Sequence, residues 1–238
     1  MNPLSHLYNG DIQGFLLSLL FILPAIVIAL SFHEAAHAWM ANKMGDPTAK
    51  NLGRISLDPT RHFDLFGFIS FILIGFGWGK PVQTNARNYY NYKKANVLVA
   101  LSGVTMNLLI ALVVLIAICV LIMTGVFLSV IPRYLLYSGF QVTFSDIVHT
   151  ILFYIVSLNL TLCFFNLIPI PPLDGHHLVK GFIARKSPGF YLNYQRYGFI
   201  ALLLLLFVTP LGDYLGQLVL LIIRAVASLF GVPFVVLY

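Results

Sequence analysis

The sequence predicts an all-α, multi-pass membrane protein, a helical bundle that also contains a short re-entrant β-hairpin. Of the 238 residues, 59% are hydrophobic and only 9% are charged, whereas a soluble domain carries about 25% charged residues. Apolar runs close to the ~20 residues that cross a bilayer recur along the chain. This composition excludes a soluble globule, and no internal repeat or low-complexity tract is visible.

Five apolar stretches are expected to form the membrane elements, in the order 12–40, 97–124, 147–168, 199–208 and 215–236. The first is expected to stay in the mature protein, because no Lys or Arg precedes it and it is too long for the apolar region of a signal peptide. We expect one domain over 1–238, with a core over about 12–182 and a C-terminal helical hairpin over about 198–236. A turn at 210–213 leaves two readings of that hairpin open, two spans or one broken helix.

A further apolar run, 65–79, is expected to enter the membrane without crossing it. The run is short, rich in β-branched and aromatic residues, and carries Gly75, Gly77 and Gly79, a pattern typical of an extended hairpin. Non-helical backbone is tolerated at membrane depth only where protein buries it or where it lines a cavity. A short core helix is the alternative, since periodicity does not separate the two over so few residues.

The formal charge of +6 is concentrated in two segments, 41–96 and 175–198, which hold nearly all the Lys and Arg residues. The segment 125–145 holds only Arg133. The positive-inside rule therefore predicts that both basic segments are cytoplasmic and that 125–145 lies outside. Topology accounts for the charge, so we expect a bacterial cell membrane protein whose surroundings are the lipid bilayer, and no nucleic-acid partner.

The sequence His33-Glu34-Ala35-Ala36-His37 stands near the expected cytoplasmic end of the first span. A helix places the two histidines, four residues apart, on one face. Two neutral imidazoles suit Zn²⁺, and the Glu between them is placed to accept a proton from water at the metal. Ionisable residues inside a membrane are costly and mark functional sites, so the motif predicts a zinc-hydrolase site.

Zinc hydrolases usually have three protein ligands and one open position, so a third ligand is needed. Glu34 is the only glutamate in the chain, which excludes a glutamate third ligand. Met40 and Lys43 stand where the extended motif HExxHxxGxxH would have its Gly and last His. An Asp or a His must therefore complete the site.

Asp174 is the best candidate for the third ligand. It closes the stretch from Asn166 to Gly175, at the cytoplasmic end of a span that runs in the same direction as the first. Prolines in this stretch break the helix and can turn Asp174 back into the bundle. Four histidines are rivals: His62, His149, His176 and His177.

Taken together, these motifs closely resemble the site-2 protease family of intramembrane zinc metalloproteases, in a compact form without PDZ or CBS domains. Besides HExxH and the Asn166 to Gly175 stretch, the match includes segments 53–64 and 76–82 and covers about residues 20–182. The order and spacing of several motifs are far more specific than HExxH alone. One departure is Ser102-Gly103-Val104, where the family often has Gly-Pro.

The resemblance implies a ligand set and a base. His33, His37 and Asp174 would bind one zinc ion per chain, and Glu34 would be the general base. The implied activity is that of a metalloendopeptidase that hydrolyses peptide bonds in transmembrane segments of single-span membrane proteins, near the cytoplasmic side. Any regulation would come from another membrane protein.

The resemblance also implies contacts with substrate. Asn166 would line the active site, and the re-entrant hairpin would pair with an extended substrate through residues that include Gly75, Phe76 and Gly77. A non-catalytic zinc sensor or transporter is the alternative function. Transport has no need for a base between two histidines, and no internal repeat of the kind common in transporters is present.

Overall fold

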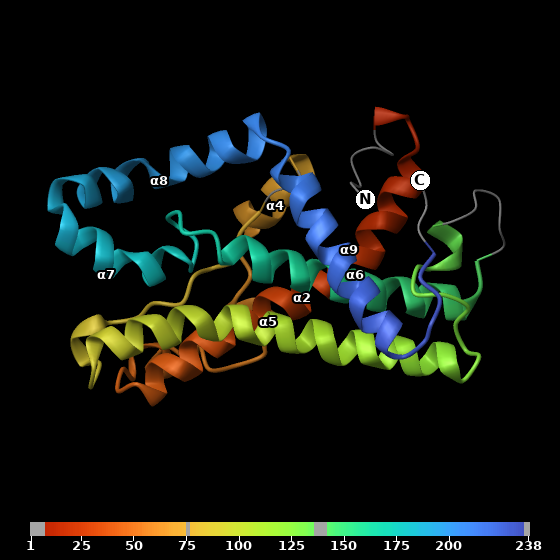
Figure 1. The fold of residues 1–238 in the computed structure, drawn as a ribbon, viewed down its shortest axis with the longest axis horizontal. Helices are drawn as coiled ribbons and strands as arrows, with labels where there is room; N and C mark the ends of the chain where they lie inside the picture. The colour runs from red at the N-terminus through yellow and green to blue at the C-terminus, as the bar shows by residue number, and fades with distance from the viewer. Residues whose placement is uncertain (1–7, 75–76, 136–141, 236–238) are drawn as a thin grey trace.

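The structure is a computed structural model that describes residues 8–74, 77–135 and 142–235 (Figure 1). Helices long and apolar enough to cross a membrane are α2 (Ile12–Lys43), α5 (Tyr92–Met123), α6 (Phe144–Asn166), α8 (Pro188–Val208) and α9 (Leu211–Leu229). The shorter helices are α3 (Thr48–Asn51), α4 (Leu65–Ile74) and α7 (His176–Lys186), with 3-10 turns η1 (Pro59–Arg61), η2 (Ala86–Asn88) and η3 (Arg133–Leu135). No strand occurs in the described ranges, and the architecture is that of a multi-pass helical bundle.

Helices α2, α5 and α6 form the centre of the bundle; α5, α6 and the C-terminal part of α2 run along its long axis (Figure 1). One apolar cluster, which contains Leu115, Leu160 and Ile223, joins α5, α6 and α9. A second, which contains Ile26 and Ile155, joins α2 to α6. These clusters hold the two segments that carry the predicted ligands, α2 and the chain that follows α6, in one packed unit.

The predicted β-hairpin over 65–79 is wrong, because residues 65–74 form helix α4. The Asp64 carboxylate caps this helix by accepting a hydrogen bond from the Gly67 N–H (2.8 Å). The ten residues, apolar except for Ser70, satisfy their own backbone hydrogen bonds as a helix and need no partner strand. Gly75 and Phe76 lie outside the described residues, and the chain resumes at Gly77 in an extended conformation.

The extended segment that follows, 77–82, packs back onto α4. A β-carbon at Gly67 would overlap the carbonyl oxygen of Trp78, so the glycine permits this close approach. The Lys80 N–H donates to the carbonyl oxygen of His62 (2.8 Å). The short helix and the extended segment together take the place of the expected hairpin.

The C-terminal part forms two helices, α8 and α9, that are separated at Pro210. Helix α8 begins earlier than expected, at Pro188, where the Ser187 side chain accepts a hydrogen bond from the Phe190 N–H (3.4 Å). The basic segment 175–198 is therefore mostly helical, since it contains α7 and the start of α8. A Ser cap followed by Pro is a common helix start.

Candidate metal centre

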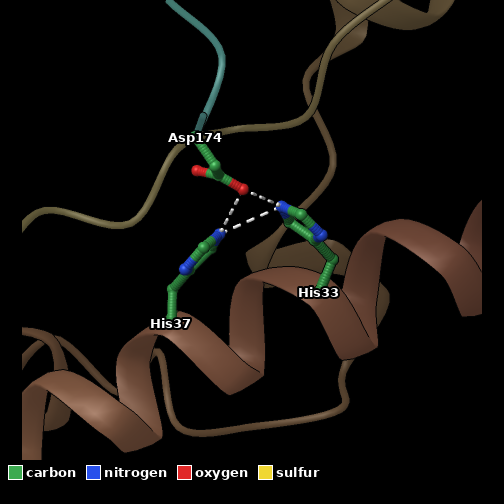
Figure 2. Close-up of side chains that lie close together, drawn as sticks. All are labelled: His33, His37 and Asp174. Carbon is green, nitrogen blue, oxygen red and sulfur yellow. Dashed lines mark hydrogen bonds and ion pairs between the residues drawn. The ribbon is translucent and has the colours of Figure 1, made fainter. Parts of the chain in front are cut away.

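Helix α2 presents His33 and His37 on adjacent turns of one face (Figure 2). Both side chains are buried, and their Nε2 atoms lie 3.0 Å apart. The spacing of four residues produces this arrangement, because such residues are stacked one turn apart on a helix. Two imidazole nitrogens therefore point at one spot.

Asp174 reaches the same spot from the loop after α6 (Figure 2). Its Oδ2 atom lies 3.2 Å from the Nε2 atoms of both histidines. The loop closes on α6 through a hydrogen bond from the Gly175 N–H to the Asn166 carbonyl oxygen (2.6 Å). Helix α8 supports the loop as well, since the Tyr194 hydroxyl donates to the Pro169 carbonyl oxygen (2.7 Å).

The tautomer of His37 makes this group a metal site. Its Nδ1 atom lies 2.7 Å from the carbonyl oxygen of Val99 and must donate to it. In the neutral ring, Nε2 is then left with a lone pair that faces the Asp174 carboxylate and His33. Ionised oxygen and imidazole lone pairs converge, and a bound cation relieves their repulsion.

Zinc fits the donor set. The three ligand atoms of His33, His37 and Asp174 lie within 4.8 Å of one another. Tetrahedral Zn²⁺ with bonds of about 2.0–2.1 Å has ligand atoms about 3.3 Å apart, close to the 3.0 and 3.2 Å found here. Two histidines and one carboxylate leave a fourth position open, as in catalytic zinc sites.

Helix α5 packs directly against the two histidines. Ser102 donates to the Val99 carbonyl oxygen (2.7 Å), the same oxygen that orients His37. A β-carbon at Gly103 would lie 2.5 Å from His37 Nε2 and 2.6 Å from His33 Cε1. The bare glycine backbone is therefore what lets α5 approach the ligand atoms.

A cavity of about 600 Å³ opens beside the three ligands, and Glu34 lines it. Glu34 Oε2 accepts a hydrogen bond from the Val82 N–H (3.0 Å). Asn166 and Gly77, two of the predicted substrate contacts, also line this cavity. The cavity thus places the Glu34 carboxylate next to the three residues that could hold a metal.

The extended segment 77–82 forms one wall of this catalytic cavity. Arg54, which is buried, donates two hydrogen bonds from Nη2, to the carbonyl oxygens of Lys80 (2.7 Å) and Pro81 (2.8 Å). These bonds hold the wall in place while its Val82 N–H contacts Glu34. Sequence reasoning did not find the roles of Arg54 and Val82, although both lie in the motifs that carry the family resemblance.

The four rival histidines do not join the metal group among the described residues. His62 Nε2 donates to the Ser56 carbonyl oxygen (2.7 Å), and His149 stacks on Phe127 with ring centroids 4.2 Å apart. His177 pairs with Asn96, whereas His176 Nδ1 donates to the Leu173 carbonyl oxygen (2.8 Å). Their positions leave Asp174 as the third member of the group that could hold a metal.

Comparison with known proteins gives consistent matches. The sequence model described as "Peptidase family M50" matches residues 21–208. The chain is 37% identical over 196 residues to "Putative zinc metalloprotease YwhC" of Bacillus subtilis (strain 168), across 82% of this chain and 83% of that protein. It is 25% identical over 198 residues to "Putative zinc metalloprotease Rip2" of Mycobacterium tuberculosis (strain ATCC 25618 / H37Rv), across 79% and 67% of the two chains. No solved structure matches.

Proposed function

This chain belongs to peptidase family M50, the site-2 protease family of zinc metalloproteases, and on that premise we propose that it hydrolyses peptide bonds within the membrane. Its substrates would be transmembrane segments of single-span membrane proteins. One observation carries the proposal, which is that Glu34 lines the same cavity as His33, His37 and Asp174. A site built only to hold or pass a metal needs no such base.

The residues divide the chemistry between them. His33, His37 and Asp174 would hold the zinc ion, which supplies a Lewis acid that polarises the scissile carbonyl and lowers the pKa of water to about 7. Glu34 takes a proton from the attacking water and delivers it to the leaving amine. Because Oε2 accepts from the Val82 N–H, Oε1 is left to receive that proton.

The wall 77–82 suggests how substrate is held. A transmembrane helix keeps its amides hydrogen-bonded, so a bond inside it must be locally unwound before cleavage. An unwound stretch can lie alongside the extended segment, between this wall and Asn166. Main-chain pairing makes little demand on sequence, so we expect helix-breaking Pro or Gly near the cut to increase cleavage.

The position of the site along the bundle suggests the side of cleavage. The metal group lies near the C-terminal end of α2 and at the C-terminal end of α6, next to the basic segments. By the positive-inside rule this end faces the cytoplasm. We therefore place the cut near the cytoplasmic end of the substrate span, in a bacterial cell membrane.

Cleavage of a panel of single-span substrates by purified protein in liposomes tests the proposal. Wild type, Glu34→Gln and a 1,10-phenanthroline-treated sample are compared, with zinc quantified in each. Glu34→Gln should keep its zinc and lose cleavage by about 10²–10⁴-fold, the usual contribution of a general base. Asp213→Asn, the same loss of one carboxylate at an exposed position of α9, serves as the matched control.

The alternative function predicts a different outcome. A zinc sensor or transporter would bind zinc and cut none of the substrates, and a transporter would also move zinc into the liposomes. Cleavage by Glu34→Gln at the wild-type rate would contradict the assignment of the base even if wild type is a peptidase.

A further inference from the structure

We propose that a second cavity, between the start of α5 and helix α7, binds the phosphate headgroup of an anionic phospholipid. This cavity has a volume of about 480 Å³ and lies beside the catalytic cavity. It belongs to the end of the bundle that carries the basic segments, and thus to the expected cytoplasmic membrane surface. We call it the basic cavity.

Charge makes the basic cavity a site for an anion. Four cationic side chains line it: Lys93, Lys180, Arg185 and Lys186. No Asp or Glu is among its described lining residues, and none of the four forms an ion pair within the described part of the chain. Four uncompensated cations around one hollow favour a ligand with a full charge and several acceptor oxygens, which a phosphate group provides.

Lys180 stands at the inner side of the basic cavity and lines the catalytic cavity as well. Burial lowers its pKa, but hydrogen bonds with the hydroxyls of Tyr92 and Tyr191 raise it above the ordinary value. The ammonium group is therefore charged at neutral pH. It stays available at the cavity wall, held by neutral partners and not by a carboxylate.

The remaining wall is apolar, and this distinguishes a lipid from a soluble phosphate. Leu178 and Phe182 on α7 line the cavity and are 39% and 69% exposed. A helix with basic residues and exposed large apolar residues lies at the membrane interface, with its apolar side against acyl chains. A soluble phosphate would leave these side chains in water, whereas a phospholipid covers them with hydrocarbon while its headgroup meets the cations.

A pair of hydrogen bonds separates the basic cavity from the catalytic one. The Asn96 side-chain amide donates to the carbonyl oxygen of His177 (3.0 Å), and His177 Nδ1 donates to Asn96 Oδ1 (3.0 Å). Both residues line both cavities. A headgroup in the basic cavity thus contacts the partition without touching the metal ligands, and its binding can be measured whether or not the protein is a peptidase.

Lipid retention measured by native mass spectrometry tests the proposal. The full Glu34→Gln chain, purified in neutral detergent, is titrated with phosphatidylglycerol or with phosphatidylcholine of the same acyl chains. Arg185→Gln/Lys186→Gln should weaken phosphatidylglycerol retention by about thirtyfold, the order expected when two basic contacts are lost, and leave phosphatidylcholine unchanged. Lys50→Gln/Arg87→Gln, which removes two exposed charges elsewhere in a basic segment, should behave as the parent chain.

Three results would overturn the proposal. The parent chain could show no preference for phosphatidylglycerol, or the control pair could lose as much as the cavity pair. Inorganic phosphate or an acidic peptide could displace the lipid at equal concentration, which would reassign the cavity to a soluble anion or to acidic substrate. Circular dichroism checks the fold of each variant, and Lys93→Gln, on the opposite wall, should weaken retention independently of α7.

Discussion

At the scale of the residue, the metal centre depends on a missing side chain as much as on its ligands. A β-carbon at position 103 would collide with His33 and His37, so only glycine fits there. The positions of His33 and His37 could be predicted, because the four-residue spacing is a property of one helix. The contact of Gly103 with them joins two helices far apart in sequence, and no local pattern encodes it.

Gly103→Ala should lower the zinc content of purified protein to well below one ion per chain. The new methyl group would lie 2.5 Å from His37 Nε2, and His37 is held by its hydrogen bond to the Val99 carbonyl oxygen, so the methyl group should push α5 away from both rings. Zinc is measured by elemental analysis after dialysis. Gly216→Ala in α9, where a β-carbon meets nothing within 4 Å, is the matched control and should keep its zinc.

Val82 provides a second test at this scale, because a backbone N–H and not a side chain is what contacts Glu34. Val82→Pro removes that donor, so the carboxylate loses its orientation and kcat should fall about tenfold or more, with zinc retained. Val82→Ala keeps the N–H and should cut nearly as fast as wild type. Equal rates for Val82→Pro and Val82→Ala would remove the N–H from the mechanism.

At the scale of the element, α4 shows what sequence reasoning could not decide. The run of apolar residues after Asp64 has no period that separates a strand from a buried helix. The decisive feature is the Asp64 cap on Gly67, whose spacing of three is visible in the sequence but also suits a turn. The glycines at 77 and 79 lie in a segment without helix, which forms no strand in the described ranges, so the hairpin expected from them is not found.

Asp46 links the end of α2 to the segment that leads into α5. It is buried and accepts hydrogen bonds from Thr48, from the Asn85 N–H (2.6 Å) and from Asn88 Nδ2 (2.8 Å). Burial raises its pKa, but these hydrogen bonds outweigh burial and hold the pKa below its ordinary value. Asp46 therefore fixes the start of α5 relative to the helix that carries the ligands.

Asp46→Asn should lower the free energy of unfolding at pH 7 by about 1–3 kcal/mol, since a buried acceptor of several hydrogen bonds is lost. The folded-state pKa lies below the unfolded one, so the native carboxylate contributes stability at pH above the unfolded value of about 3.8. That contribution disappears as the pH falls through the folded value. Thermal unfolding in detergent should show the variant's largest deficit at pH 7 and a deficit that shrinks progressively as the pH falls below about 3.8, with Asp213→Asn unaffected.

At the scale of the whole molecule, charge and hydropathy predicted the helical bundle. They left two alternatives for the C-terminal segment, two spans or one broken helix, and could not decide between them. Pro210 separates α8 from α9, and each is long enough to cross a bilayer. The lengths of the apolar stretches and the distribution of charge do not predict that Tyr194 of α8 supports the Asp174 loop, because that contact forms only when the helices pack.

The proposed topology can be checked with single cysteines. Lys50→Cys should react with a membrane-impermeant maleimide only from the cytoplasmic side, and Leu128→Cys only from outside, since both positions are exposed and lie on opposite sides of the bundle by the charge rule. The native Cys119 and Cys163 are buried, so background labelling should be low. Labelling of both cysteines from one side would reject this orientation.

Removal of zinc should lower the Tm of the whole protein, because the ion joins α2 to the chain that follows α6. Dialysis against 1,10-phenanthroline removes a ligand that binds only the folded state, and adding Zn²⁺ back should restore the Tm. Asp174→Ala should show no comparable metal-dependent shift. A shift of equal size in Asp174→Ala would place the stabilising ion elsewhere.

The separation of the ligands along the chain also has a meaning for biosynthesis. A ribosome delivers α2, with both histidines and Glu34, long before it delivers Asp174. Until α6 has been inserted and its loop has turned back onto α2, the nascent protein holds a base and two ligands but lacks the third. On the proposed function, the nascent protein would therefore be unable to cut neighbouring membrane proteins until the Asp174 loop has reached α2.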